Sequence, residues 1–382
     1  MSEQRVSDVV VVGGGVIGLA CAWRAAQRGL VVTVLERERP GAGASWVAAG
    51  RLAPVTESHF GEEKLLRLNL AAAEAYPAFA SELEQASGHP VGYRRCGALA
   101  LALDRDDVEE LKRLEAFQRS LGLEVEWLLP TACRGLEPGL STACAGGLWA
   151  ASEGEVDPRA LTTALVAAAE RAGVSIHQGE KVTRAQIQGN RITGVETEYG
   201  TRYGAGQVVL AAGAWSGQLD WLPADARPPV RPVKGQLLRL RAADGEPVCG
   251  RLVRTPFVYV VPREDGKVIV GATSEERGFD TTVTAGAVHE LLREAYRVLP
   301  DIAELELDEA LAGLRPGTPD NAPIVGRGAI EGLLLATGHY RNGILLAPVT
   351  GEAVAALLAG ETPSDAFAVC APDRFASTME AR

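Results

Sequence analysis

The N-terminal stretch constrains the fold more than any other part of the chain. An apolar run at residues 9–12 is followed by Gly13, Gly15 and Gly18, which have the spacing G-x-G-x-x-G. The run predicts a buried parallel strand, and residues 17–28 predict a helix that packs on it. A strand, a glycine turn and a helix in this order begin a βαβ unit, so we expect a parallel α/β sheet.

Each glycine of this turn has its own physical reason. Gly13 permits the tight turn, Gly15 lets the backbone approach a pyrophosphate, and Gly18 lets the helix pack close to the sheet. Residues 30–36 predict a second strand that ends in Glu36, a carboxylate placed to accept hydrogen bonds from an adenosine ribose. The acid favours NAD or FAD over NADP. The alternative is a glycine-rich turn that binds no ligand.

The segment after Glu36 favours FAD over NAD. An NAD-binding unit continues through alternating strands and helices, whereas residues 37–54 predict a long loop rich in glycine and alanine, without periodicity. The small residues from 41 to 50 suit a backbone that lies against a flat, rigid ring system. The segment resembles the FAD-dependent family of D-amino-acid oxidase, sarcosine oxidase and glycine oxidase, in which this loop passes the flavin.

The resemblance extends over nearly the whole chain. A helix is predicted with Pro158 at or near its first position, and residues 179–200 predict short alternating strands that include Val182. Residues 207–210 predict a returning parallel strand. In the family, the matching valine meets the adenine with its backbone, and the small-residue turn at 211–213 marks the return of the chain to the cofactor domain.

Alternating apolar and polar residues between 227 and 311 predict half-buried antiparallel strands, and residues 91–107 predict further strands. The expected fold class is α/β: an FAD-binding Rossmann-like domain with a second α+β substrate domain built on an antiparallel sheet, as in D-amino-acid oxidase. The predicted division assigns residues 1–88, 144–226 and 320–382 to the FAD-binding domain, and residues 89–143 and 227–319 to the substrate-binding domain.

A strand, a turn and a helix are predicted between residues 332 and 360. Asn342-Gly343 is also a strong signal for a hairpin turn, but the apolar residues that follow recur at helical spacing to Leu358 and do not alternate. In the family, the N-terminus of the matching helix faces the pyrimidine edge of the flavin, where its dipole stabilises negative charge. Pro348 lies within the first turns, which leaves open a later start of the regular helix.

Two arginines and a tyrosine form the predicted catalytic set. A guanidinium can hold a carboxylate through two parallel hydrogen bonds. The resemblance implies that Arg315 is the carboxylate clamp, that Tyr259 gives the same carboxylate a second hydrogen bond, and that Arg341 attracts the substrate. The alternative for each arginine is a surface salt bridge or a hydrogen bond that caps a backbone carbonyl. His339 and His59 are expected to be packing or surface residues, because hydride transfer from a neutral amine needs no protein base.

Three further residues are predicted to line the substrate pocket: Arg51, Phe257 and Ser274. In relatives of the glycine oxidase type, a methionine matches Arg51 and a histidine matches Phe257. We hypothesise that Arg51 narrows the pocket or admits an extra anionic group. Because no cysteine lies between Cys249 and Cys370, the covalent flavin link of monomeric sarcosine oxidases is not expected, and the FAD should be non-covalent.

The predicted cofactor contacts come from the N-terminal turn, the end of the second strand, the glycine and alanine loop, the adenine-binding valine, the return turn and the start of the last helix. They are Gly13, Gly15, Val16, Ile17, Gly18, Glu36, Arg37, Ser45, Ala48, Ala49, Gly50, Val182, Ala212, Gly213, Asn342, Gly343 and Ile344.

Composition limits the partners. The net charge of -11 and the pI near 5.2 argue against nucleic acid or an anionic membrane surface. The six cysteines show neither C-x-x-C spacing nor the density of a disulfide scaffold, so reduced thiols and a cytoplasmic location are expected. The polar N-terminus indicates neither export nor a membrane anchor. No metal site is predicted, and the resemblance implies a homo-oligomer, a tetramer.

The expected function is FAD-dependent oxidation of glycine or another small amine, such as sarcosine or D-alanine, to an imine that is hydrolysed to glyoxylate and ammonia. Oxygen is the expected electron acceptor and gives hydrogen peroxide. The resemblance further implies that the imine serves thiamin thiazole synthesis. The alternatives are a D-amino-acid dehydrogenase or a sarcosine or D-proline oxidase that uses another acceptor, and an FAD-binding component without catalysis.

Overall fold

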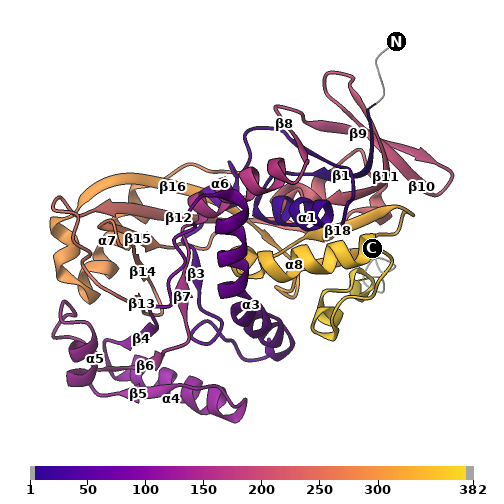
Figure 1. Cartoon of the computed structure of the whole chain (residues 1–382). Helices are drawn as coiled ribbons and strands as arrows, with labels where there is room; N and C mark the ends of the chain where they lie inside the picture. The colour runs from indigo at the N-terminus through magenta and orange to yellow at the C-terminus, as the bar shows by residue number, and fades with distance from the viewer. Residues whose placement is uncertain (1–4, 376–382) are drawn as a thin grey trace.

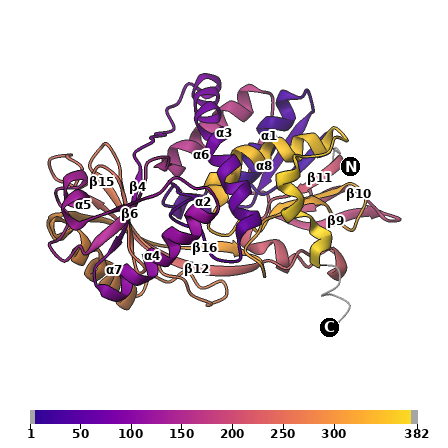
Figure 2. The ribbon, with the colours of Figure 1, turned by 90° about the horizontal axis from the view of Figure 1, so that it is seen from below.

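The computed structural model describes residues 5–375, which form two lobes, each built around an eight-stranded sheet (Figure 1). Two long strands, β12 (Arg231–Arg241) and β16 (Glu306–Gly317), extend from the second lobe towards the first, as two perpendicular views show (Figures 1 and 2). The predicted fold class, a parallel α/β sheet joined to an antiparallel sheet, is confirmed.

The first sheet is centred on β1 (Arg5–Val12), which pairs in parallel with β11 (Arg202–Leu210) on one side and β2 (Val32–Glu36) on the other. The remaining strands are β8 (Ser175–Gln178) beside β2, β18 (Leu333–Thr337) and β17 (Ile324–Arg327) beyond β11, and the branch β9 (Val182–Gln188) and β10 (Arg191–Thr197). The βαβ unit that the glycine spacing predicts is therefore present.

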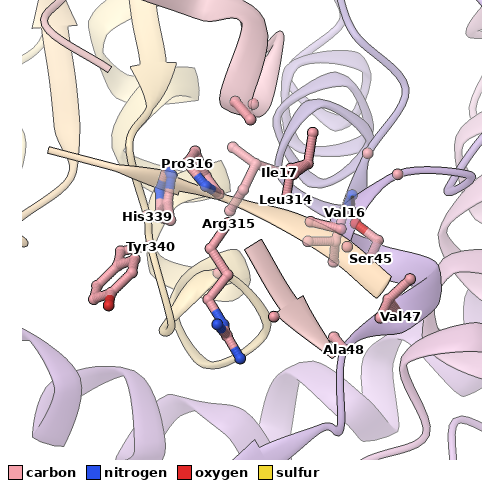
Figure 3. Close-up of a pocket in the computed structure, with 18 of the residues that line it drawn as sticks. Val16, Ile17, Ser45, Val47, Ala48, Leu314, Arg315, Pro316, His339 and Tyr340 are labelled. Carbon is pink, nitrogen blue, oxygen red and sulfur yellow. Dashed lines mark hydrogen bonds between the residues drawn. The ribbon is translucent and has the colours of Figure 1, made fainter. Parts of the chain in front are cut away.

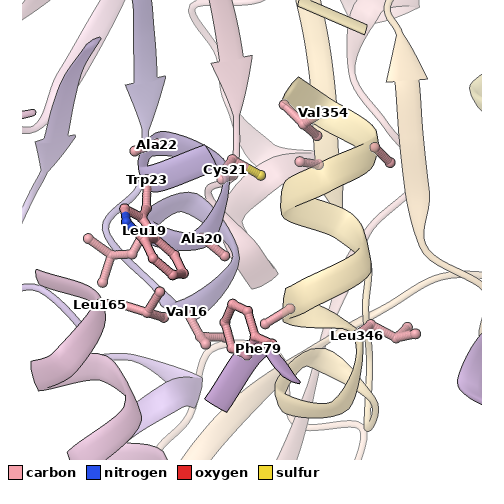
Figure 4. Packing of buried hydrophobic residues seen from close by; sticks show 14 of the residues in the cluster. Val16, Leu19, Ala20, Cys21, Ala22, Trp23, Phe79, Leu165, Leu346 and Val354 are labelled. Carbon is pink, nitrogen blue, oxygen red and sulfur yellow. The ribbon is translucent and has the colours of Figure 1, made fainter. Parts of the chain in front are cut away.

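Residues 9–12 of β1 are buried on both faces of the sheet, which explains the uninterrupted apolar run. Val9 and Val11 belong to a core that contains the helices, whereas Val10 and Val12 belong to a second core with β9 and β10. The helices of the first core are α1 (Val16–Gln27), α3 (Glu63–Ser87), α6 (Pro158–Arg171) and α8 (Gly343–Leu358). Figure 4 shows Trp23, Phe79 and Leu165 close together beside α8, and the Trp23 and Phe79 ring centres lie 5.9 Å apart.

Two helix starts agree with the sequence. Asp157 caps α6 by accepting hydrogen bonds from the backbone of Arg159 (2.8 Å) and Ala160 (3.2 Å), and Pro158 is the first residue of the helix. The helix α8 begins at Gly343 as predicted.

Pro348 lies inside α8, so the later start left open by the sequence is wrong. A proline at this position cannot donate to the carbonyl four residues earlier, which is that of Ile344. The Tyr76 hydroxyl on α3 donates to that carbonyl instead, at 3.2 Å. A side chain from a neighbouring helix thus satisfies the acceptor that the proline leaves free.

The second sheet has the order β16-β12-β15-β14-β13-β4-β6-β5, and its neighbours are antiparallel except for the pair β13 and β4. The remaining strands are β15 (Lys267–Gly271), β14 (Tyr259–Pro262), β13 (Leu252–Arg254), β4 (Ala98–Ala102), β6 (Gly146–Ala150) and β5 (Glu126–Leu128). The helices of this lobe are α4 (Arg105–Ser120), α5 (Pro130–Leu136) and α7 (Ala285–Val298).

Two expectations for this lobe need correction. Residues 232–240 of β12 are buried on both faces, not half-buried as their alternation predicts. The strand β6 pairs with β4 and β5 in the second sheet, although the predicted division assigns residues 144–226 to the FAD-binding domain. We therefore propose to move the boundary at residue 144 to a point after Ala150.

The predicted irregular loop at 37–54 contains regular structure. A short helix, α2 (Ala44–Val47), is followed by β3 (Arg51–Leu52), which pairs with β7 (Gly154–Glu155). The short connections are five turns of 3-10 helix: η1 (Gly213–Gln218), η2 (Ala224–Ala226), η3 (Pro300–Glu304), η4 (Asp365–Cys370) and η5 (Pro372–Phe375).

Within residues 5–375, no helix is both long and apolar enough to cross a bilayer, and no group of three or more histidine, cysteine or acidic side chains is arranged to hold a metal ion. All six cysteines are free thiols, and only Cys96 is not fully buried.

Candidate active site

A cavity of about 890 Å³ lies between the two lobes, and both sheets contribute to its walls. All six predicted substrate-side residues line it: Arg51, Phe257, Tyr259, Ser274, Arg315 and Arg341. The predicted cofactor contacts also line it, except for Gly18 and Asn342. Figure 3 shows part of this wall, with Arg315 extending from β16 into the space between Tyr340 and Ala48.

The glycine turn after β1 leaves room only where a ligand needs it. A Cβ atom on Gly13, which has φ of +110°, would lie 2.4 Å from the Ala211 carbonyl oxygen. A Cβ on Gly18 would lie 2.0 Å from the Gly13 carbonyl oxygen, so Gly18 permits close packing and does not face the cavity. A Cβ on Gly15 would meet only the Ser45 hydroxyl, at 3.5 Å, and would otherwise fill the cavity over the start of α1.

Glu36, the carboxylate predicted to bind the adenosine ribose, is the last residue of β2. The Glu36 carboxylate accepts hydrogen bonds from the backbone of Gly14 (2.7 Å) and Glu38 (2.9 Å), which fixes it at the cavity wall. Beside it, the Arg37 guanidinium lies 3.6 Å from the centre of the Trp215 ring. The sequence analysis did not single out Trp215, which follows the predicted return turn and also lines the cavity.

The loop that was predicted to pass the flavin is held on both sides. The Ser45 hydroxyl accepts a hydrogen bond from Val16 at the start of α1 (3.0 Å). The Arg263 guanidinium, which is buried in the second lobe, donates to the Ala49 carbonyl (2.6 Å) and pairs with Glu155. Arg263 was not predicted, because it directly follows a strand far along the chain.

The start of α8 faces the cavity through Gly343 and Ile344. The cap residue, Asn342, makes no hydrogen bond with its side chain, so the first backbone N–H groups of the helix are free to face a ligand. His339, which also lines the cavity, is buried beside this turn and shares a 3.0 Å hydrogen bond with Thr350. Burial lowers its pKa to about 3, which keeps the imidazole neutral and agrees with a packing role.

Arg315 and Tyr259 occupy gaps that two glycines provide. A Cβ on Gly235 would lie 2.3 Å from a guanidinium nitrogen of Arg315, and a Cβ on Gly271 would lie 2.4 Å from the Tyr259 hydroxyl. The Arg315 guanidinium donates to the Thr273 carbonyl at 3.0 Å, and no carboxylate among residues 5–375 forms a salt bridge with it. Glycines inside strands are a known sign of close approach, so this signal was readable from the sequence.

The other two arginines of the predicted pocket are paired. Arg341 forms a salt bridge with Glu62, which also accepts a hydrogen bond from Asn321 (2.8 Å). Arg51 forms a salt bridge with Glu57, and its guanidinium lies 3.7 Å from the centre of the Tyr259 ring. These carboxylates were not predicted, and they reduce the attraction that either arginine can exert on an anion.

The mouth of the cavity is partly polar and partly aromatic. Phe257 is 61% exposed, and Ser274 and His59 are also exposed at the cavity wall. Arg254 lines the same region and stands directly opposite Tyr259 in the pairing of β13 with β14. Burial, the largest influence, lowers the pKa of Arg254.

Comparison with known proteins gives consistent matches. A family described as FAD dependent oxidoreductase (DAO) matches residues 8–357. The bifunctional protein ThiO/ThiG of Synechocystis is 38% identical over 98% of this chain and 55% of its own length, and the chain therefore spans about half of that relative. The glycine oxidase of Geobacillus kaustophilus is 36% identical over 92% of each chain. A crystal structure of glycine oxidase from G. kaustophilus superimposes with a TM-score of 0.91, at 34% identity, over 97% of this chain and 99% of that one.

Proposed function

The chain belongs to the family of FAD-dependent oxidoreductases, and on that premise we propose that it oxidises glycine and other small amines, such as sarcosine and D-alanine, to imines. The imine is hydrolysed to ammonia and, from glycine, glyoxylate, and oxygen accepts the electrons to give hydrogen peroxide. The observation that carries the proposal is the Arg315 guanidinium, which faces the cavity without a carboxylate partner among the described residues.

The residues at the other end of the cavity fit FAD. The open space above Gly15 and the start of α1 suits a pyrophosphate, and Glu36 suits an adenosine ribose. The loop at Ala48–Gly50 and the start of α8 line the cavity and would hold the flavin ring. No cysteine is among the described residues that line the cavity, which supports non-covalent binding. When bound, FAD supplies a two-electron acceptor.

The chain's own residues bind and orient the substrate. Arg315 holds the carboxylate through two parallel hydrogen bonds, and the Tyr259 hydroxyl donates a third. Together they place the Cα-H of the amino acid towards the centre of the cavity. Burial lowers the pKa of His339 to about 3, so its imidazole is too weak a base to take the ammonium proton of the substrate. The amino acid gives that proton to water and reacts as its free amine. The N–H groups at the start of α8 stabilise negative charge on the group that accepts the electrons.

One of the comparisons supports a proposal for how the product is used. The Synechocystis relative is a bifunctional ThiO/ThiG protein, of which this chain matches one part. We therefore propose that the imine formed here supplies thiamin thiazole synthesis.

The first test is anaerobic mixing of the purified yellow protein with glycine, followed by the visible spectrum of the flavin. We expect bleaching, because only a Cα-H that faces the flavin can reduce it. Admission of air should restore the yellow form and release one hydrogen peroxide per flavin. A protein that stays yellow with glycine, sarcosine and D-alanine would overturn the proposed substrate class, and bleaching without fast recovery in air would overturn oxygen as acceptor.

A further inference from the structure

The wall of the substrate pocket includes a segment with little regular structure, residues 51–59, which we name the pocket segment. It carries Arg51, Glu57 and His59 to the cavity wall. Its start is held by the pairing of β3 with β7, but beyond Leu52 it has no strand partner. The positions of these three side chains therefore depend on what holds the middle of the segment.

The buried carboxylate of Glu153 binds the middle of the pocket segment through hydrogen bonds. Glu153, which is 1% exposed, accepts hydrogen bonds from the backbone of Val55 (2.6 Å) and Thr56 (2.7 Å) with one oxygen. Its other oxygen accepts the Thr56 hydroxyl at 2.6 Å. A carboxylate that satisfies three donors in a buried place is a strong and directional anchor.

Two further side chains of the second lobe bind the same two residues. Gln118 on α4 donates to the Val55 carbonyl (2.8 Å), and Arg254 on β13 donates to the Thr56 carbonyl. The backbone polar groups of both residues are thus satisfied by side chains of other elements. Glu153 provides three of these bonds and is not itself among the residues that line the cavity.

We propose that Glu153 is a positioning residue: by holding Val55 and Thr56, it fixes the pocket segment and so sets how tightly the cavity binds its amino-acid substrate. The expected effect on substrate binding rests on the proposed function. The hydrogen bonds of Glu153 to Val55 and Thr56 do not depend on it. It predicts that loss of Glu153 acts on substrate binding more than on cofactor binding, because the FAD end of the cavity is held by Ser45 and Arg263.

The protonation state offers an independent readout. Burial raises the pKa of the Glu153 carboxyl to about 7, against the lowering effect of its Thr56 hydrogen bonds, and Glu57 raises it further. The charged groups that face it are Glu57 on the pocket segment and Arg254 on β13. The neutral form keeps all three bonds, because a protonated oxygen can donate to the Thr56 hydroxyl. The ionised form holds its donors more strongly.

The experiment compares the wild-type holoenzyme with E153A, E153Q and the control E137A. Glu137 is a second buried carboxylate, 3% exposed, which accepts the Gly250 N–H at 3.1 Å away from the cavity. For E153A we expect the KM for glycine to rise by about tenfold with a smaller change in kcat and unchanged FAD affinity. Amide hydrogen exchange at Val55 and Thr56 should rise by roughly tenfold or more. E137A should change neither the KM nor this exchange.

The isosteric variant E153Q distinguishes a role of Glu153 in positioning the pocket segment from a general contribution to the stability of the fold. Its amide can accept both N–H groups and donate to the Thr56 hydroxyl, so it mimics the neutral carboxyl. At pH 6, E153Q and the wild type should show the same KM and the same exchange at Val55 and Thr56. At pH 8, the wild type should exchange more slowly than E153Q, because only its carboxylate ionises.

The inference is overturned if E153A leaves Val55 and Thr56 protected, or if it exposes them without raising the KM. Should E153A not yield folded holoenzyme, T56V removes one of the three bonds and keeps the side-chain shape; a KM rise of about threefold is then expected, and an unchanged KM rejects the idea. If the wild type oxidises none of the small amines, the proposed function fails, and the exchange at Val55 and Thr56 still decides whether Glu153 grips the segment.

Discussion

The two ends of the cavity are built in different ways. At the cofactor end, the glycine turn and Glu36 come from one continuous βαβ unit. At the substrate end, Arg315, Tyr259 and the pocket segment come from distant parts of the chain and meet only when the second sheet forms. The comparison teaches that the proposed cofactor contacts of the glycine turn depend on local backbone geometry, whereas the proposed substrate contacts depend on side chains that tertiary packing brings together.

The largest expected effect is on substrate turnover, at the substrate end of the cavity, with no effect at the cofactor end. Replacing Arg315 with methionine should lower kcat/KM for glycine by about a thousandfold, or roughly 4 kcal/mol, because the substrate carboxylate loses its charged partner. FAD affinity should not change. Steady-state kinetics and flavin titration measure both quantities.

Arg231→Met is the matched control for this change, because Arg231 lies on the neighbouring strand β12, is half-exposed and pairs with Glu276 away from the cavity. A kcat/KM for R315M within tenfold of the R231M value would contradict the carboxylate clamp.

The second largest expected effect is a loss of FAD affinity at the cofactor end of the cavity. Gly13→Ala places a methyl group 2.4 Å from the Ala211 carbonyl oxygen at a φ of +110°. We expect FAD to bind about a hundredfold more weakly, for a cost of roughly 3 kcal/mol. Gly29→Ala also has a positive φ, of +84°, but open space around it, so it should leave FAD affinity unchanged. Equal FAD affinity in both variants would show that the turn does not form the cofactor site.

The third prediction concerns His339, which lines the cavity, and the pH dependence of the free energy of unfolding. Its pKa of about 3 lies below the ordinary value of 6.5, so the unfolded chain binds more protons between these pH values and stability falls as the pH drops below 6.5. From pH 7 to pH 5 this histidine alone should remove about 2 kcal/mol of unfolding free energy. Urea unfolding of H339Q at both pH values should lack this loss. An identical pH dependence in the variant would show that His339 is accessible to protons.

The smallest expected effect is a rise in the KM for glycine, caused by a change at the substrate end of the cavity. Gly271→Ala would push against the Tyr259 ring, because the new Cβ would lie 2.4 Å from the hydroxyl. We expect the KM for glycine to rise by about tenfold with FAD affinity unchanged. Gly286→Ala, in open space on α7, is the control. If the two variants have the same KM, Tyr259 does not bind the substrate.

Sequence reasoning reached the cofactor end because its signals are contiguous. The glycine spacing, the second strand and its terminal acid predict a βαβ unit, and the structure contains it. The start of α8 was also predictable, since the residues after Gly343 recur at helical spacing. The passage of α8 through Pro348 was not, because it depends on the Tyr76 hydroxyl of another helix.

The pairings at the substrate end were not predictable. Arg51 with Glu57 and Arg341 with Glu62 depend on the path of a segment that has no periodicity. Gly235 and Gly271 carried a usable signal, because a glycine inside a strand marks a close approach, but which side chain fills the gap is decided by strand register.

The order of the chain gives the first sheet a further property. The strand β18 and the helix α8, which complete the cofactor end, lie at residues 333–358, after nearly all of the second lobe. During translation, the N-terminal βαβ unit therefore emerges long before the helix that closes its site, and the second lobe is made in between. The proposed FAD site is therefore completed late in synthesis: a ribosome that stalls before residue 333 holds a chain in which the glycine turn is present but β18 and α8 are not.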